Sequence, residues 1–171
     1  YKRQIIVIGS GPGGYVAAIR AAQLGKKVAV VERAEAGGVC LNWGCIPTKA
    51  LLKSAQVYNY CKSAEHYGLD FAGEVRPDLE KIVARSRGVA ETMNKGVLFL
   101  LKKNNVELIN GFAKLKGNGR IDVDGTEYEA DHIILATGAR PREMPFMPID
   151  GEHVISSKQA LSLIHISEPT R

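Results

Sequence analysis

The sequence predicts an α/β fold, with a doubly wound parallel sheet and an inserted antiparallel β-meander. Two observations support this prediction. At the N-terminus, a buried-strand pattern, a glycine-rich turn, an alanine-rich helical pattern and a second buried-strand pattern follow one another, and such a unit requires a right-handed crossover between parallel strands. In the last part of the chain, from Val106 onward, the helical period gives way to short strand patterns separated by glycine turns.

The first unit is justified element by element. Gln4 to Ile8 is a continuous apolar run that ends in glycine, which is typical of a strand buried on both faces. The alanine-rich run from Tyr15 to Leu24 predicts a helix that Gly25 ends. Lys27 to Val31 predicts a second buried strand, which ends at Glu32.

Helical patterns occupy the middle of the chain. The segment from about Val39 to Tyr60 predicts a helix with an irregular start, and Pro77-Asp78 opens a longer one. In the longer segment an apolar stripe recurs at helical spacing and predicts a packing face. Its members are Leu79, Ile82, Val83, Ala90, Met93, Val97, Leu100 and Leu101.

The meander is predicted from four short segments, VELI, GFAKLK, RIDV and EYEA. Gly117-Asn118-Gly119 and Asp124-Gly125 lie between successive segments and have good turn chemistry. His132 to Ala136 then predicts another buried strand, which runs into Thr137-Gly138.

Composition is that of an ordinary globular domain, with 171 residues, 45% hydrophobic and 24% charged. The formal net charge is +5, but the basic residues are scattered and no cluster of basic and aromatic residues predicts nucleic-acid binding. No apolar run approaches the roughly 18 residues that a membrane span needs. We therefore expect neither a nucleic-acid nor a membrane partner, and a cytoplasmic location.

The glycine-rich turn is a candidate nucleotide site. Gly9-x-Gly11-x-x-Gly14 lies between a strand and a helix, where Gly9 permits the tight turn, Gly11 the approach of a pyrophosphate, and Gly14 close helix–strand packing. Glu32 lies 18 positions after Gly14 (32 − 14), at the end of the second strand, where its carboxylate is suited to an adenosine ribose. The alternative is a glycine-rich turn that binds nothing, and the motif alone does not separate FAD from NAD.

The cysteine pair Cys40 and Cys45 is the most specific feature. In a regular helix the two thiols would lie about 140° apart, so a direct bridge needs a distorted turn, which Gly44 and Pro47 suit. A bridge across so few residues adds little stability, which favours reversible exchange, and a helix N-terminus and the nearby Lys49 would favour the thiolate. Zinc binding is the alternative, although further ligands at suitable spacing are missing, so no metal is expected.

The remaining cysteine and the histidines are not assigned to a site. Cys61 lies in a helical pattern and is interpreted as a small buried hydrophobic residue. The four histidines are isolated in the sequence and are interpreted as surface or satisfied residues rather than bases: His66, His132, His153 and His165.

The segment Gly37-Gly38-Val39-Cys40-Leu41-Asn42-Trp43-Gly44-Cys45-Ile46-Pro47-Thr48-Lys49-Ala50-Leu51-Leu52 closely resembles the redox segment of the pyridine nucleotide–disulfide oxidoreductases. The resemblance runs from about Gln4 to Leu161 and includes Ala136-Thr137-Gly138-Ala139-Arg140-Pro141. Within the family the segment is most similar to members that oxidise dihydrolipoamide. Glutathione and mercuric reductases are the alternative, but they more often have valine where this chain has Leu41 and Ile46.

The resemblance implies an FAD-type Rossmann domain, with NAD bound by a later domain. It implies that Cys40 exchanges with the dithiol substrate, that Cys45 faces the flavin, and that Lys49 lies near the flavin ring. The residues implied to hold FAD are Gly9, Gly11, Gly14, Glu32, Thr137, Gly138 and, through its backbone beside the adenine, Ala113. The implied partners are lipoyl domains of 2-oxo acid dehydrogenase complexes and, in the full-length protein, a second copy as a homodimer.

The resemblance also implies a domain organisation. Residues 1–161 would be the N-terminal part of the FAD-binding domain, with the NAD-binding and dimerisation domains absent, so we expect this chain alone to be inactive. Residues 162–171 resemble translated sequencing-adapter DNA rather than the family, and are expected to be non-native and to pack poorly. The alternative from a different class is a non-catalytic FAD-binding remnant or docking module.

Overall fold

A computed structural model describes residues 2–70 and 72–163. The elements in chain order are β1 (Lys2–Ile8), α1 (Pro12–Gln23), β2 (Val28–Glu32), α2 (Gly38–Trp43), α3 (Cys45–Lys62), η1 (Ala64–Tyr67), α4 (Leu79–Lys103), β3 (Glu107–Asn110), β4 (Ala113–Gly117), β5 (Arg120–Val123), β6 (Thr126–Leu135) and α5 (Ser157–Ala160). They fall into two compact units. The first combines Tyr1–Asn42 with Glu91–Arg140, and the second combines Trp43–Ala90 with Pro141–Arg171.

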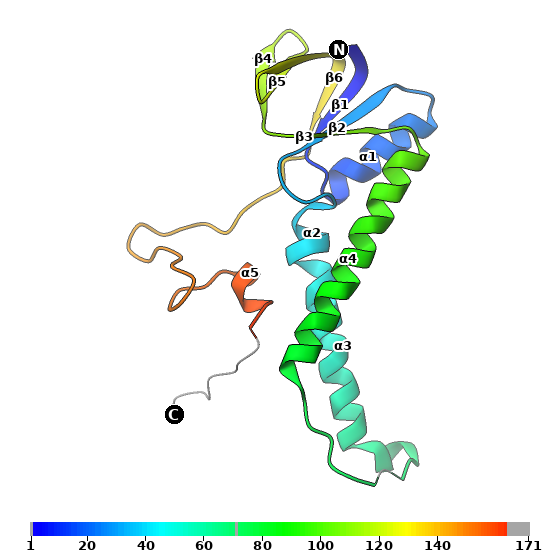
Figure 1. The fold of residues 1–171 in the computed structure, drawn as a ribbon, viewed down its shortest axis with the longest axis vertical. Coiled ribbons are helices and arrows are strands. Elements are labelled where there is room, and N and C mark those ends of the chain that lie inside the picture. Colours follow the sequence, from blue (N-terminus) through cyan, green and yellow to red (C-terminus); the bar gives the residue numbers. More distant parts are fainter. Residues whose placement is uncertain (1, 71, 164–171) are drawn as a thin grey trace. The chain divides into compact units, whose positions relative to one another are not determined.

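The first unit is built on a six-stranded sheet with the order β3-β2-β1-β6-β5-β4 (Figure 1). The strands β3, β2, β1 and β6 pair in parallel, whereas β6, β5 and β4 pair antiparallel. The predicted α/β fold, with a parallel sheet and an antiparallel meander, is thus confirmed.

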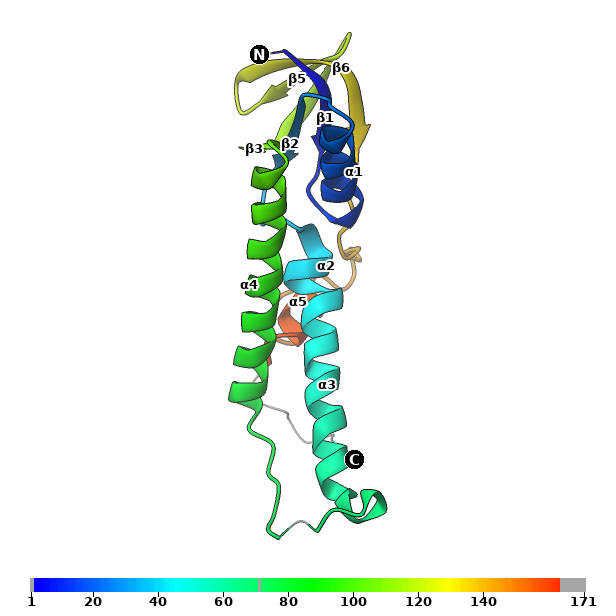
Figure 2. The same cartoon turned by 90° about the vertical axis from the view of Figure 1, so that its right-hand side faces the viewer.

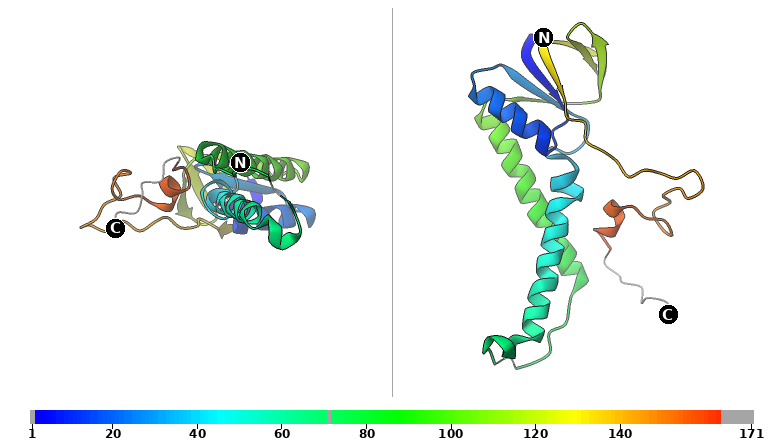
Figure 3. Two further views of the ribbon diagram at one scale, coloured as in Figure 1. Left: turned by 90° about the horizontal axis from the view of Figure 1, so that it is seen from below. Right: turned by 180° about the vertical axis from the view of Figure 1, so that it is seen from behind.

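Local sequence explains the β1–α1–β2 unit. Ile6 and Val7 are fully buried in β1, and Val28–Glu32 is buried along most of its length, as continuous apolar runs require. The helix α1 lies against β1 and β2, as the view from behind shows (Figure 3). It starts earlier than predicted, at Pro12, and Gly25, with φ of +80°, reverses the chain after it.

The meander differs from the prediction in its first and last strands. The VELI segment was expected to belong to the meander, but it forms β3 and pairs in parallel with β2, with Leu108 opposite Val30. The EYEA segment and the following buried-strand segment were expected to be separate strands. They form one strand, β6, whose first part pairs with β5 and whose remainder pairs with β1. Only β4, β5 and the start of β6 make up the meander.

The predicted burial of His132 to Ala136 is wrong for part of the strand. Ile134 and Leu135 are 37% and 60% exposed, and His132 is also exposed. A continuous apolar run is typical of a strand that other elements bury on both faces of the sheet. In the described part of the chain, no element packs over these side chains far enough to bury them.

In the second unit, α3 and the first turns of α4 run side by side in opposite directions (Figure 2). The Arg85 guanidinium joins them by donating to the Ala50 carbonyl at 2.9 Å and to the Ser54 hydroxyl at 3.3 Å. The short helix α5 begins with a capping box in which Ser156 and Gln159 satisfy each other's backbone amides.

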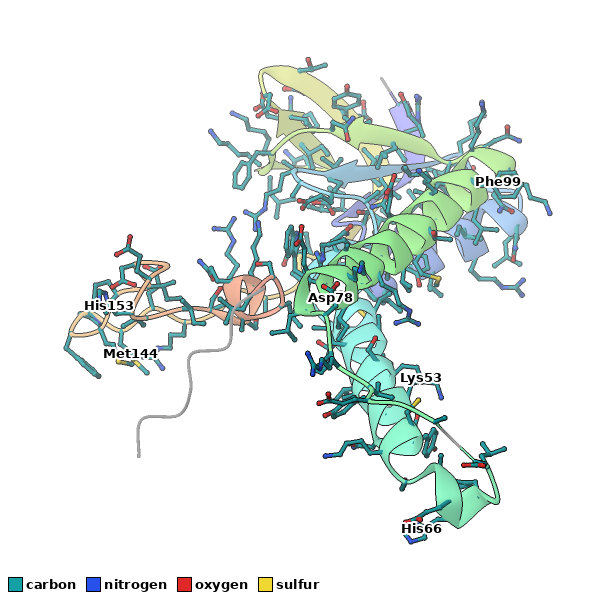
Figure 4. All side chains as sticks on the ribbon, turned by 60° about the horizontal axis from the view of Figure 1, so that its bottom comes forward. Lys53, His66, Asp78, Phe99, Met144 and His153 are labelled. Carbon is teal, nitrogen blue, oxygen red and sulfur yellow. The ribbon has the colours of Figure 1, made fainter. Side chains whose placement is uncertain are left out.

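The apolar stripe of α4 is only partly a packing face. Ala90, Val97 and Leu101 are buried, as predicted. Met93 and Leu100 are 44% and 41% exposed. Phe99, which was not assigned to the stripe, is 63% exposed and labelled in Figure 4.

The solvent exposure of the histidine and cysteine side chains tests several other predictions. His66, His132 and His153 lie at the surface, as predicted, and two of them are labelled in Figure 4. Cys61 is half-buried rather than fully buried. His165 and almost all of the segment expected to be non-native, residues 164–171, lie outside the described residues. Among the helices that the structure describes, none is long and apolar enough to cross a membrane.

Candidate nucleotide loop and redox segment

The turn between β1 and α1 has no room for side chains at two of its glycines. A Cβ on Gly9, which has φ of +101°, would lie 2.2 Å from the Ala136 carbonyl oxygen. A Cβ on Gly14 would lie 1.8 Å from the Gly9 carbonyl oxygen and 3.4 Å from the Ala136 side chain. These positions therefore require glycine for packing, which is the role predicted for Gly14.

Gly11 has a different environment, because a Cβ on it would meet nothing within 4 Å. It is the N-cap of α1, and Pro12 occupies the first turn without an acidic residue. The first amides of a helix have no carbonyl partner within the helix, and the helix dipole places positive charge there. The backbone at Gly11 and Gly13 thus forms an open cradle suited to a phosphate group.

The carboxylate of Glu32, at the end of β2, reaches back to this loop. Its Oε2 accepts hydrogen bonds from the Ser10 amide at 2.9 Å and the Ser10 hydroxyl at 2.7 Å. Its Oε1 accepts from the amides of Arg33 at 2.9 Å and Ala34 at 3.0 Å. Burial alone would raise the pKa of Glu32, but these hydrogen bonds outweigh it and hold the pKa below its ordinary value. Glu32 is therefore an ionised acceptor at neutral pH.

The segment between β3 and β4 meets the same end of the sheet. Gly111 donates its amide to the Glu32 carbonyl at 2.8 Å, and its φ of +151° and close contact with Asp124 leave no space for a side chain. Asp124 also accepts from the Phe112 amide at 3.2 Å. Ala113 follows at the start of β4 and packs against the core of the sheet. Ala113 therefore follows closely after Gly111, the residue whose amide contacts the Glu32 carbonyl.

The segment after β6 returns to the glycine loop. The Ala136 amide donates to the Ile8 carbonyl at 2.8 Å, and the Thr137 Cα would lie 3.3 Å from a Cβ on Gly9. Gly138 follows with φ of +68°. In the first unit the structure therefore brings together the predicted positions Gly9, Gly14, Glu32 and Thr137.

The first half of the redox segment is attached to the nucleotide loop. Gly37 donates its amide to the carbonyl oxygen of Ser10 at 3.1 Å and to the Ser10 hydroxyl at 3.2 Å. A Cβ on Gly38 would lie 2.7 Å from the Gly11 Cα. Helix α2 starts at Gly38, buries Leu41, and carries the half-buried Cys40.

The second half of the redox segment lies in the second unit. Gly44, with φ of −143° and ψ of −113°, interrupts the helical path, and α3 starts at Cys45. The predicted distortion between the cysteines is therefore observed at Gly44. Cys45 is exposed at the N-terminus of an 18-residue helix, and Lys49 is exposed one turn later. Lys49 belongs to the second unit, whereas the glycine loop belongs to the first.

Two contacts in the second unit support this segment. Pro47 is fully buried in the first turn of α3, and its carbonyl accepts from the buried Ser86 hydroxyl at 3.4 Å. The Trp43 ring lies near two cations, with the Arg87 guanidinium carbon 4.5 Å and the Lys158 nitrogen 4.4 Å from its centroid. Cations over an indole ring are stabilising.

Sequence reasoning missed Ser10, Asn94 and the two cations at Trp43. Ser10 is fully buried inside the glycine motif, and a polar residue between two required glycines was a signal for it. Asn94 lies among apolar and charged residues of α4, and no sequence motif marks it. Within the described ranges, no group of three or more His, Cys, Asp or Glu side chains is gathered as a metal ion would require.

Known proteins resemble the chain along most of its length. Residues 3–168 match the pyridine nucleotide-disulphide oxidoreductase family. A dihydrolipoyl dehydrogenase of Zymomonas mobilis is 54% identical over 92% of this chain and 34% of its own length. One from Rhizobium etli is 49% identical over 92% of this chain and 37% of its own length.

A solved structure is also similar to this chain. The crystal structure of LpdA from Mycobacterium tuberculosis matches with a TM-score of 0.84 and 29% identity, over 95% of this chain and 38% of that one. The chain spans about a third of the length of the Zymomonas mobilis and Rhizobium etli relatives. The family resemblance seen in the sequence is confirmed: the chain belongs to the pyridine nucleotide-disulphide oxidoreductase family.

Proposed function

We propose that the chain is the N-terminal part of the FAD-binding domain of a dihydrolipoyl dehydrogenase, which oxidises protein-bound dihydrolipoamide with NAD+ through Cys40 and Cys45. The observation that carries the proposal is the attachment of the Cys40 helix to the nucleotide loop, through Gly37 on Ser10 and Gly38 on Gly11. The reaction needs a residue that exchanges with the dithiol substrate to be held beside the loop that binds the dinucleotide, and Cys40 would have this position.

The residues of the first unit fit FAD. The open backbone at Gly11 and Gly13 suits the pyrophosphate, and the ionised Glu32 suits the ribose hydroxyls. The carboxylate already accepts four hydrogen bonds, so a ribose hydroxyl would compete with the Arg33 and Ala34 amides, whose residues are exposed. Thr137, Gly138 and Ala113 would complete the site. When bound, FAD would take two electrons from the dithiol and pass them to NAD+ held by another domain.

The chain's own residues would perform the exchange in two displacements. A thiolate of dihydrolipoamide attacks the Cys40 sulfur of the Cys40–Cys45 disulfide, forms a mixed disulfide and releases Cys45 as a thiolate. The second substrate thiolate then attacks the substrate sulfur of that mixed disulfide. This step closes the lipoamide ring and releases Cys40 as a thiolate, so that the substrate loses two electrons and two protons while the cysteine pair gains two electrons.

Two features of α3 support the role of Cys45. The residue is the first of an 18-residue helix, where the dipole favours a negatively charged sulfur. Lys49, exposed on the next turn, would place its ammonium near the flavin ring. The proposed partners are lipoyl domains of 2-oxo acid dehydrogenase complexes and a second copy of the complete protein.

The test uses the complete protein encoded by the parent gene, with Cys40→Ser, Cys45→Ser and the control Cys61→Ser. We expect either of the first two changes to abolish dihydrolipoamide-dependent reduction of NAD+, and Cys61→Ser to leave it unchanged. Activity retained without Cys40 or Cys45 would contradict the proposal. Preference for glutathione over dihydrolipoamide would reassign the substrate. The chain of 171 residues alone is expected to show no turnover.

A further inference from the structure

The helix that carries Cys40 is too short to be stable by itself. Helix α2 has six residues, whereas isolated helices shorter than about 12 residues are marginal in water. Its position must therefore come from tertiary contacts. Leu41 supplies a buried anchor, and side-chain hydrogen bonds hold the start of the helix.

Those hydrogen bonds converge on the Ala36 carbonyl, just before the helix. The Asn42 side-chain amide donates to the carbonyls of Ala36 and Gly38, both at 2.9 Å. The Asn94 side-chain amide, from α4, donates to the same Ala36 carbonyl and to the Asn42 Oδ1 at 3.2 Å. Both hydrogens of each amide group are used, and the Ala36 carbonyl accepts two bonds.

The network continues to the nucleotide loop. Gly37, next to Ala36, donates to Ser10, and Ser10 donates to Glu32. The start of α2 is thus held by the glycine loop on one side and by Asn94 on the other. Leu41 lies close under Gly37, where a Cβ would approach it within 2.6 Å, so this turn has little freedom to move.

We propose that Asn94 is a positioning residue for the redox pair, which holds α2 so that Cys40 is presented for exchange. This inference rests on the proposed function of the cysteine pair. The role requires two hydrogen-bond donors at residue 94, because both groups that it meets are acceptors. Aspartate has nearly the same shape but would place an acceptor against two acceptors, and alanine would remove both bonds.

The first test measures thiol alkylation in the reduced 171-residue chain, with iodoacetamide and peptide mass spectrometry. Loss of the Asn94 bonds should loosen α2 and raise the alkylation rate of the half-buried Cys40 about five- to tenfold, an effect of the size expected for lost hydrogen bonds. Cys61, also half-buried but in the other unit, should not change. Asn94→Asp and Asn94→Ala are compared with Asn104→Ala, which removes only a bond of 2.8 Å to the Leu100 carbonyl.

Each outcome of this test has one meaning. A rise confined to Cys40, absent in Asn104→Ala, supports the proposal. An equal rise at Cys61 means that Asn94 serves general stability, and unchanged Cys40 reactivity means that it holds nothing at α2; both overturn the proposal. Asn42→Ala, which breaks the same network from the other side, should repeat the Asn94 result.

The second test measures the dithiol–disulfide equilibrium of Cys40 and Cys45 in the same variants against dithiothreitol buffers. Loosening α2 lowers the effective concentration of one thiol at the other, so Asn94→Asp should lower the equilibrium constant for disulfide formation about tenfold, which is about 30 mV. If the unaltered chain forms no Cys40–Cys45 disulfide, the proposed function fails and this inference fails with it. If the disulfide forms with the same constant in every variant, only the role of Asn94 fails.

Discussion

The Glu32 carboxylate accepts hydrogen bonds from both the amide and the hydroxyl of Ser10, at 2.9 and 2.7 Å. The same hydroxyl oxygen accepts a bond from the Gly37 amide at 3.2 Å. One buried side chain thereby connects the end of β2, the glycine loop and the segment that leads to Cys40. Because buried polar groups are costly when a partner is removed, this connection has measurable consequences.

Replacing Ser10 with alanine should destabilise the first unit by about 1–3 kcal/mol, because the half-buried Glu32 carboxylate and the Gly37 amide each lose the Ser10 hydroxyl as a partner and keep only their bonds to the backbone. Urea unfolding of the 171-residue chain measures the change. Ser63→Ala is the control, since the Ser63 hydroxyl makes only a local bond of 2.8 Å to the Asn59 carbonyl. If both substitutions change the free energy of unfolding equally, the Ser10 network contributes no more stability than one local hydrogen bond, and the prediction is wrong.

The stability of the first unit should depend on the ionisation of Glu32. Its pKa lies below the ordinary value of 4.5 because hydrogen bonds from Ser10, Ala34 and Arg33 outweigh burial. A depressed pKa adds stability above the unfolded-state value, and this stability is lost as the pH falls through the folded-state pKa. Glu32→Gln should therefore be less stable than the unaltered chain at neutral pH, and the difference should shrink between about pH 5 and about pH 3.

Urea midpoints measured over this range check the prediction. Ser10→Ala retains the Glu32 charge but removes one of its hydrogen bonds, so its pH dependence should be intermediate between those of the unaltered chain and Glu32→Gln. A difference that stays constant across the range would mean that the Glu32 charge does not contribute.

Two adjacent glycines in the first turn of α1 should respond oppositely to alanine. Gly14→Ala places a Cβ 1.8 Å from a backbone oxygen and should cost about 3 kcal/mol or more. Gly13→Ala meets nothing within 4 Å and should stabilise the helix by up to about 1 kcal/mol. Thermal unfolding followed by circular dichroism distinguishes them, and similar melting temperatures would refute the packing argument.

Trp43, the sole tryptophan of the sequence, reports on its two cations. Lys158→Ala should uncover one face of the ring, move its fluorescence emission to longer wavelength and cost about 0.5–1 kcal/mol. Lys62→Ala is the matched control, because the Lys62 nitrogen lies 5.6 Å from the centre of the Tyr58 ring. An emission spectrum that responds to neither or to both substitutions would contradict the contact between Lys158 and Trp43.

Local patterns allowed the first unit's core to be predicted. The order of strand, glycine turn, helix and strand is written in contiguous residues, and Gly9, Gly14 and Glu32 take the positions that this order requires. The helix break at Gly44 was also predictable, because the cysteine spacing does not suit a regular helix.

Features that depend on distant residues were not predictable. The segment at Leu108 has the same composition in a parallel or an antiparallel strand, and its pairing with Val30 depends on the path of the whole chain. Exposure of Leu135 depends on what covers the sheet rather than on its own neighbours in sequence. Asn94 acquires significance only because folding places it beside Ala36.

The strand β6 also determines where the chain tolerates changes of length. Glu129 pairs with Arg120 on one side and with Lys2 on the other, so it belongs to both ladders. Deleting one residue near it would force every side chain beyond that point to the opposite face against one partner. Next to Gly68, the described residues 65–70 are exposed and pair with no strand, so an affinity tag or label inserted after Gly68 would leave both ladders intact.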